Sequence, residues 1–279
     1  MTRRLRVVID VAGALLVGLT TLATAMAAGP ATLVAAHRGG AALWPENSLL
    51  AFRSALALGV DALELDLHLT ADGEVVVLHD PTLDRTSTGG GPVRDMKLAD
   101  LAAVRLKARA GALTGERVPT FAQVLDLAAP TSVELVPEIK VDAKRQRYDG
   151  IEEKVLALIR ARGLLARTTV QAFQVETIRR LRELEPQART MLLVARGDVE
   201  RDRARPAEAV RRARELGATD LGMNHRLIDA DVMAAARAAG IRVAAWTVNE
   251  EADMRRMVGL GVDMVMSDRP DLAKRLMGR

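Results

Sequence analysis

The chain contains no cysteine among its 279 residues. This absence excludes disulfide bonds, thiolate metal sites, a cysteine nucleophile and a lipidated N-terminal cysteine. It leaves the redox compartment open, because an exported protein can fold without disulfides. Any metal site in this chain must therefore use ligands other than thiolates.

Aromatic residues are also scarce, at 2% of the chain, so the core must be built from Leu, Val, Ala and Met. The chain also has little excess of one sign of charge. The 40 Lys and Arg oppose 36 Asp and Glu, and half of the resulting net charge of +4 lies in residues 1–27. The remaining arginines are spread over helical segments together with acidic residues and are not interleaved with aromatics. This pattern favours a solvated surface and no nucleic-acid partner.

Only one long hydrophobic run is present, and it lies at the N-terminus. Val7 to Ala27 is nearly all apolar apart from Asp10, follows three arginines and ends in small residues that form Ala-x-Ala cleavage sites. This pattern predicts a signal peptide over residues 1–27 and a mature protein over residues 28–279 that is periplasmic or secreted. The run is also just long enough to span a bilayer. An uncleaved N-terminal anchor is therefore the alternative, and it would be the only membrane contact.

From residue 31 onward, apolar β-type runs alternate with amphipathic helical patterns. The expected strands lie at 33–37, 61–67, 133–139, 168–173, 190–194, 219–223, 241–247 and 262–266. The expected helices lie at 47–59, 151–162, 175–185, 206–216, 229–239 and 250–260, and several end at a glycine. Eight strands with intervening helices predict a TIM-type (β/α)8 barrel with a parallel sheet. An open doubly wound sheet is the alternative, although no dinucleotide-type glycine loop follows any strand.

One additional apolar run, residues 75–78, breaks this alternation. It follows the second strand after only five residues, whereas a parallel crossover needs a dozen or more. We therefore expect an inserted antiparallel strand, with a hairpin turn at Asp72-Gly73. A turn at this position places Asp66 opposite residue 78 and Glu64 opposite residue 80. The hairpin thus returns His79 to the end of the sheet that carries the two carboxylates.

The segment after the hairpin, residues 81–120, is expected to be a long loop with a helical portion near 97–107. Its glycine-rich stretch at 86–91 leaves two interpretations open. It could lie over the site as a flexible cover, or it could be part of an ordinary surface loop.

Three carboxylates fall at the ends of neighbouring expected strands. Glu64 and Asp66 are two residues apart, so their side chains share one face, and Glu138 ends the next parallel strand. Barrel active sites lie at the C-terminal ends of the strands, so these groups should converge there. Without a cation they would repel one another strongly. Oxygen ligands suit Ca²⁺ or Mg²⁺, and also Mn²⁺, so the sequence predicts one divalent metal ion.

Two histidines and two basic residues border the same expected site. His37 ends the first strand and His79 ends the hairpin. Such a pair can divide the proton transfers of ester cleavage, with one histidine deprotonating the nucleophile and the other protonating the leaving oxygen. Arg38 and Lys140 suit the oxygens of a phosphate ester. His68 lies nearer the hairpin turn, which favours a structural role.

The motifs resemble the signature of the glycerophosphodiester phosphodiesterase family from about residue 33 to residue 271. The resemblance rests on the order and spacing of His37-Arg38-Gly39, Pro45-Glu46-Asn47-Ser48, Glu64-Leu65-Asp66-Leu67-His68-Leu69-Thr70, Asp72-Gly73, Val76-Val77-Leu78-His79-Asp80, Asp84-Arg85-Thr86, Val118-Pro119-Thr120, Glu138-Ile139-Lys140, Trp246-Thr247-Val248-Asn249 and Gly261-Val262-Asp263. It implies a barrel enzyme that hydrolyses small-molecule glycerophosphodiesters, which are deacylated phospholipids, to glycerol 3-phosphate and an alcohol.

The resemblance also implies roles for particular residues. It implies that His37 and His79 form an acid/base pair and that Glu64, Asp66 and Glu138 form a metal site. It also implies that Arg38 and Lys140 bind phosphate and that Glu46, Phe173 and Trp246 form a possible rim. One departure is visible at Ala172-Phe173, where the family often has Ser-Phe. We expect this change to remove a hydroxyl near the site.

Two other functions remain open at this point. A phospholipase D-like enzyme acting on lysophospholipids or sphingolipids would need an apolar surface or lid for acyl chains, and residues 81–120 show little of that. A non-catalytic glycerophosphodiester-binding protein of the envelope would have no use for a pair of proton-transferring histidines. The attacking oxygen, from water or from the glycerol 2-hydroxyl, and the oligomeric state also remain open.

Overall fold

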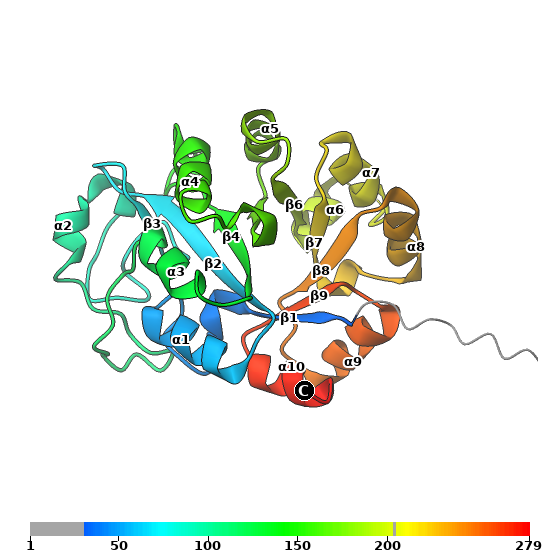
Figure 1. Ribbon diagram of the computed structural model, residues 1–279, viewed down its shortest axis with the longest axis horizontal. Coiled ribbons are helices and arrows are strands. Elements are labelled where there is room, and N and C mark those ends of the chain that lie inside the picture. The colour runs from blue at the N-terminus through cyan, green and yellow to red at the C-terminus, as the bar shows by residue number, and fades with distance from the viewer. Residues whose placement is uncertain (1–30, 203–204) are drawn as a thin grey trace, which may run out of the picture.

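Eight parallel strands close into a barrel in the computed structural model, which describes residues 31–202 and 205–279 (Figure 1). Around the barrel the strands are β1 (Leu33–Ala36), β2 (Ala62–Leu69), β4 (Glu134–Ile139), β5 (Thr169–Ala172), β6 (Arg189–Val194), β7 (Asp220–Asn224), β8 (Arg242–Trp246) and β9 (Met264–Ser267). Strand β1 pairs with both β2 and β9, so the sheet has no open edge between its first and last strands. This closure confirms the predicted TIM-type barrel and excludes the open doubly wound sheet.

Helices cover the outside of the barrel. The six expected helices are confirmed as α1 (Leu49–Leu58), α4 (Ile151–Arg160), α5 (Val175–Leu184), α7 (Glu208–Glu215), α8 (Ala230–Ala239) and α9 (Glu251–Leu260). Three further helices were not expected: α3 (Phe121–Ala128), α6 (Arg196–Asp202) and α10 (Pro270–Leu276). Local signals for two of them were present, because Thr120 and Gln123 form a capping box at the start of α3 and Pro270 is the first residue of α10.

The alternation of side chains along β2 separates the hydrophobic core from the polar interior of the barrel mouth. Leu63, Leu65 and Leu67 belong to an outer core cluster that also contains Phe52 and Phe121. The residues between these leucines are polar, and they point to the opposite face of the strand. All eight positions of β2 are buried, so both faces of this strand are structurally constrained.

Replacing Leu65 with Ala should lower the free energy of unfolding by about 2–5 kcal/mol, because the side chain is fully buried and its removal leaves a cavity. Leu113→Ala is a matched control, since Leu113 is 63% exposed. The control should change stability by less than about 0.5 kcal/mol. Urea unfolding of the two variants measures the difference, and equal losses would contradict this assignment of the core.

The inserted strand β3 (Val75–Val77) pairs antiparallel with β2 outside the barrel. Leu67 pairs with Val77, and the backbone N–H of Leu78 donates to the carbonyl of Asp66 at 3.0 Å. The predicted register, with Asp66 opposite residue 78, is therefore confirmed. It follows that His79 stands beside the mouth of the barrel.

Residues 81–120 form an insertion whose small hydrophobic core is shared with Val76 and Leu78 of the hairpin. Its helical portion is shorter than expected and consists of the 3-10 turn η2 (Val93–Asp95) and α2 (Leu98–Leu101). In the glycine-rich stretch, a Cβ on Gly89 would lie 2.7 Å from Leu83 Cδ1 and 3.1 Å from Val104 Cγ2. Gly89 is thus packed on its own insertion, and none of residues 86–91 lines the cavity at the mouth of the barrel.

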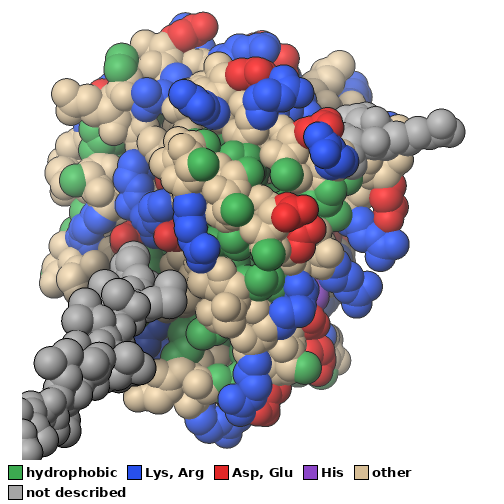
Figure 2. All heavy atoms as spheres, turned by 90° about the vertical axis from the view of Figure 1, so that its right-hand side faces the viewer, with side chains coloured by type: hydrophobic (Ala, Val, Ile, Leu, Met, Phe, Trp, Pro, Cys, Tyr) green, Lys and Arg blue, Asp and Glu red, His purple; other side chains and the backbone are tan. Residues whose placement is uncertain are grey.

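The face of the molecule in Figure 2 carries Lys and Arg side chains dispersed among acidic ones, without a continuous basic stripe. Several charges pair along their own helix, such as Arg211 with Glu215 at 2.9 Å and Arg255 with Glu251 at 2.6 Å. This face therefore agrees with the expected solvated surface.

Within residues 31–202 and 205–279, every helix is too short or too polar to cross a bilayer. The expected signal peptide lies outside the described residues.

Candidate active site

A cavity of about 110 Å³ lies at the C-terminal ends of the barrel strands and brings together most of the residues expected from the sequence. Its lining consists of His37, Arg38, Glu64, Asp66, His79, Glu138, Lys140, Gln171, Phe173, Leu193, Trp246, Thr247 and Met266. Both histidines, both cations, all three carboxylates and two of the three rim residues are among them. Glu46, the third rim residue, is not part of the lining but accepts a hydrogen bond from Arg38 at 3.2 Å.

A strained turn after β1 places His37 and Arg38 at this cavity. Arg38 has a left-handed backbone (φ 53°), which is costly for a residue with a Cβ and is typical of functional sites. Its backbone N–H donates to Glu64 Oε2 at 2.8 Å. Gly39 follows with φ 80°, and a Cβ there would lie 2.7 Å from the Cβ of Ala51. The turn therefore requires glycine and anchors Arg38 to a carboxylate of β2.

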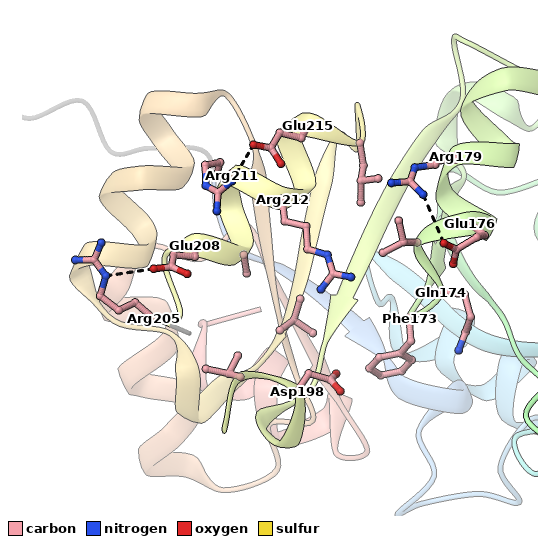
Figure 3. Close-up of a pocket in the computed structure, with 15 residues that line it drawn as sticks. Phe173, Gln174, Glu176, Arg179, Asp198, Arg205, Glu208, Arg211, Arg212 and Glu215 are labelled. Atoms are coloured by element: carbon pink, nitrogen blue, oxygen red, sulfur yellow. Dashed lines mark hydrogen bonds and ion pairs between the residues drawn. The ribbon is translucent and has the colours of Figure 1, made fainter. Parts of the chain in front are cut away.

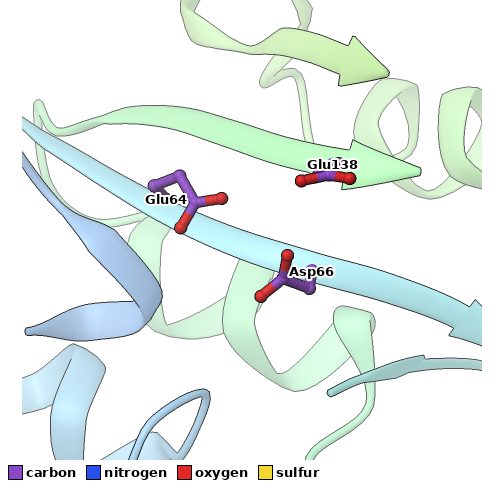
Figure 4. Close-up of side chains that lie close together, drawn as sticks. All are labelled: Glu64, Asp66 and Glu138. Atoms are coloured by element: carbon purple, nitrogen blue, oxygen red, sulfur yellow. The ribbon is translucent and has the colours of Figure 1, made fainter. Parts of the chain in front are cut away.

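Three buried carboxylates form the floor of the site (Figure 4). Glu64 and Asp66 come from β2, and Asp66 is in register with Glu138 on the adjacent β4. Each carboxylate offers an oxygen within 4.8 Å of those of the other two. The ammonium of Lys140 lies 3.3 Å from Asp66 Oδ1 and 2.9 Å from Glu138 Oε1.

Lys140 does not balance the charge of the three carboxylates. Burial and the neighbouring charge of Asp66 raise the pKa of Glu64 to about 7, and burial also raises the pKa of Glu138. Burial opposes ionisation of Asp66 as well, but the charges of Lys140, His79 and Arg38 outweigh it and lower the pKa of that carboxyl. A group of buried carboxylates that retains excess negative charge fits a divalent cation with oxygen ligands.

His37 is held by Asp268, a carboxylate that was not among the expected site residues. Its Nδ1 lies 2.6 Å from Asp268 Oδ1, and Asn249 donates to the other oxygen of Asp268 at 2.8 Å. Burial would lower the pKa of His37, but the charge of Glu64 and the hydrogen bond with Asp268 outweigh it and raise the pKa. The bond at Nδ1 leaves Nε2 available for chemistry, and Nε2 lies 3.9 Å from Glu64 Oε2.

His79 is held on two sides. Its Nδ1 lies 2.7 Å from Asp80 Oδ1, and its backbone carbonyl accepts a hydrogen bond from His68 Nε2 at 3.2 Å. The other ring nitrogen of His68 accepts from the hydroxyl of Tyr148 at 2.9 Å. Burial lowers the pKa of His68 to about 4, so the ring is neutral near neutral pH, and Nε2 then carries the proton that it donates to the carbonyl. His68 thus has the structural role expected for it, while burial also lowers the pKa of His79.

Two amide side chains complete the site and were given no role from the sequence. Gln171 on β5 donates to Glu64 Oε1 at 2.9 Å, and Asn47 donates to Asp66 Oδ2 at 2.8 Å. Gln171 carried only the weak signal of a polar residue within an apolar strand. Asp268 had a stronger signal, because it is a carboxylate near the C-terminal end of a barrel strand, as Glu138 is.

The expected effect of Ala172 on the site is wrong. Ala172 is packed in the outer core with Ile178 and Leu192, whereas its neighbours Gln171 and Phe173 line the cavity. Successive residues of a strand point to opposite faces, so a hydroxyl at position 172 would face the helices and not the cavity.

A larger groove of about 840 Å³ lies between α5 and α7 (Figure 3). Many of its charged side chains are paired with one another: Arg179 with Glu176 at 3.5 Å, Arg205 with Glu208 at 3.5 Å and Arg211 with Glu215 at 2.9 Å. It meets the cavity only at Phe173 and contains neither a histidine nor a carboxylate of the buried group. The smaller cavity is therefore the candidate active site.

Comparison with known proteins agrees with this assignment. Residues 37–272 match the model of the glycerophosphoryl diester phosphodiesterase family. A glycerophosphodiester phosphodiesterase of Caldanaerobacter subterraneus is 32% identical over 241 residues, covering 86% of this chain and 95% of that protein. One of Bacillus subtilis is 31% identical over 255 residues, covering 86% and 84% respectively.

A solved structure shows the same relationship in three dimensions. The crystal structure of a glycerophosphodiester phosphodiesterase from Agrobacterium tumefaciens superimposes with a TM-score of 0.72 at 26% identity, covering 88% of this chain and 99% of that one. The family match includes every residue of the candidate active site. The chain therefore belongs to the glycerophosphoryl diester phosphodiesterase family.

Proposed function

We propose that this protein hydrolyses glycerophosphodiesters to glycerol 3-phosphate and an alcohol, and that it requires one divalent cation. The observation that carries the proposal is the convergence of two histidines, two cationic side chains and three carboxylates on one small cavity. Each group has a task in phosphodiester cleavage, and family membership supplies the substrate class.

Glu64, Asp66 and Glu138 would hold the cation. They offer oxygen ligands alone, which suits Ca²⁺ or Mg²⁺, with Mn²⁺ also compatible. A bound cation would supply electrostatic stabilisation of the negative charge on the phosphate oxygens. Gln171 and Asn47 orient the carboxylates of Glu64 and Asp66 through the hydrogen bonds described above.

Arg38 and Lys140 are the cationic side chains for the phosphate. Both line the cavity, and their side chains are only 18% and 15% exposed, so their charges are weakly screened by water. The rings of Phe173 and Trp246, whose centroids lie 5.6 Å apart, form an apolar wall for the carbon atoms of the substrate.

The two histidines would transfer the protons. Each has Nδ1 engaged with a carboxylate, which leaves Nε2 as the reactive nitrogen. One takes the proton of the attacking oxygen, and the other delivers a proton to the oxygen of the departing alcohol. Positioning of the phosphodiester by Arg38 and Lys140 places both proton transfers at one phosphorus centre.

A substrate panel tests this function against the phospholipase D-like alternative. Glycerophosphocholine, glycerophosphoethanolamine and glycerophosphoglycerol are compared with lysophosphatidylcholine by measuring alcohol release. We expect turnover of the deacylated diesters and at least about tenfold lower kcat/KM for the lysolipid, since most residues that line the cavity are charged or polar and offer little apolar surface to an acyl chain. Preference for the lysolipid would favour the alternative, and binding without turnover would indicate a non-catalytic binding protein.

We further propose that the protein is exported, to the periplasm or out of the cell. The support is the basic, apolar and small-residue pattern of residues 1–27. N-terminal sequencing of protein isolated from its native cells should give a mature chain that begins near residue 28. A chain that still begins near Thr2 would favour the membrane anchor or a cytoplasmic enzyme.

A further inference from the structure

A row of alternating positively and negatively charged side chains crosses the rim of the site. Arg85 donates from Nε to Asp80 Oδ2 at 2.6 Å and from Nη2 to Asp80 Oδ1 at 2.9 Å. The same guanidinium donates from Nη1 and Nη2 to the two oxygens of Glu46 at 2.9 and 2.8 Å. Beyond these two carboxylates stand His79, bonded to Asp80 at 2.7 Å, and Arg38, bonded to Glu46 at 3.2 Å.

We propose that Arg85, acting through Asp80 and Glu46, is a positioning residue that orients His79 for proton transfer and Arg38 for phosphate binding. The inference rests on the proposed function, because that function gives His79 and Arg38 the roles that Arg85 supports. It also explains why Glu46 stands at the rim without facing the substrate.

The geometry makes Arg85 the centre of this arrangement. One guanidinium engages all four oxygens of two carboxylates, and bidentate bonds of this kind fix the plane of each carboxylate. Hydrogen bonds with Arg85 outweigh the effect of burial and lower the pKa of Asp80 to about 2 and the pKa of Glu46 below its usual range. Both carboxylates therefore remain ionised and able to accept hydrogen bonds near neutral pH.

The ring of His79 depends on this support. The bond from His68 holds only the backbone carbonyl of His79, so it leaves the ring free to rotate. Among the described residues, Asp80 is the hydrogen-bond partner of the ring. A carboxylate held in one plane by Arg85 keeps the proton on Nδ1 of His79 and directs Nε2 toward the cavity.

The connection to Arg38 gives the arrangement a second effect. Arg38 contacts Glu46 through Nη1 at 3.2 Å and lies near Asp66 through Nε at 3.6 Å. Loss of Arg85 would leave Glu46 held only by Arg38, and the guanidinium of Arg38 would follow the freed carboxylate. Removal of Arg85 should therefore lower kcat through its effect on His79 and raise KM through its effect on Arg38.

The first test compares Arg85→Ala with Arg160→Ala in the full-length protein. Arg160 is a matched control, because it is 45% exposed against 48% for Arg85 and also makes two bonds to a carboxylate, at 2.8 and 2.6 Å, far from the site. We expect R85A to lower kcat for glycerophosphocholine about tenfold and to raise KM, while R160A leaves both within about twofold. R85K should restore part of the activity. Equal kinetics of R85A and R160A would overturn the inference.

The second test separates positioning from general damage to the fold. In an H79A background, R85A should lower kcat by less than about twofold, because the group through which it acts is gone. Wild type, R85A, H79A and the double variant are all assayed with glycerophosphocholine at high enzyme concentration, and thermal unfolding confirms that the variants are folded. A loss in H79A as large as in the wild type would contradict a role through His79. Turnover by the wild-type protein, measured alongside, shows separately whether the proposed function holds.

A spectroscopic measurement tests the same point without catalysis. In protein labelled with ¹⁵N-histidine, His79 should show the Nδ1–H tautomer near neutral pH, and R85A should lose this preference. The resonance is assigned by its absence in H79A. An unchanged tautomer in R85A would overturn the inference even if the substrate had been misassigned.

Discussion

His37→Ala and His79→Ala should each lower kcat by about 10²-fold or more, the usual scale of general acid–base catalysis. Both imidazoles line the cavity, and each is bonded at Nδ1 to a carboxylate, at 2.6 Å for His37 and 2.7 Å for His79. Their removal takes away the proton transfers and leaves the barrel core intact. Steady-state kinetics with glycerophosphocholine measures the loss.

His225→Ala is the control, because this histidine lies outside the cavity and should leave kcat within about twofold. The losses at His37 and His79 should not add in full, since both groups serve one transition state. An activated nitrophenyl ester should partly rescue the variant that has lost the general acid. If neither substitution lowers kcat by more than a few-fold in a folded protein, the proposed proton transfers are wrong.

Removing divalent cations with EDTA should abolish activity, and adding Ca²⁺, Mg²⁺ or Mn²⁺ should restore it. The reason is the excess negative charge of Glu64, Asp66 and Glu138, whose oxygens lie within 4.8 Å of one another. Glu64→Gln removes one charge from this group while keeping the shape of the side chain. It should weaken cation binding by about tenfold or more, measured by calorimetry.

The pH dependence of stability provides a second measurement on the metal-free protein. The pKa of Glu64 is raised from 4.5 to about 7, so the native state holds this proton more tightly than the unfolded state. Stability of the metal-free protein should therefore fall as the pH rises from about 4.5 to about 7. In Glu64→Gln this contribution is absent, and a bound cation should suppress it in the wild type. Full activity after exhaustive chelation would contradict the metal assignment.

The residues that could be predicted from the sequence are those related by short, regular spacing. Glu64 and Asp66 share a face because a strand has a period of two, and the hairpin placed His79 by simple counting from its turn. The same periodicity located every strand of the barrel within a few residues. It did not locate α3 or α10, which are short and are recognised by their capping residues rather than by a long apolar pattern.

The contacts that could not be predicted are those made only by closure of the barrel or by the folding of separate loops. Asp268 is 231 residues from His37 along the chain and reaches it because β9 pairs with β1. Gln171 is 107 residues from Glu64 and meets it across the barrel interior. The same limit applies to Glu46 and Arg85, whose contact depends on how two separate loops fold toward each other.

The central claim is that one P–O bond of a glycerophosphodiester is broken so that the phosphate stays on glycerol. Phosphorus-31 NMR of glycerophosphocholine incubated with the metal-loaded protein tests it most directly. We predict that the diester resonance is replaced by that of glycerol 3-phosphate, and that neither the chelated protein nor His79→Ala produces this change at a comparable rate. Formation of phosphocholine, or an unchanged diester resonance with the metal-loaded protein, would contradict the claim.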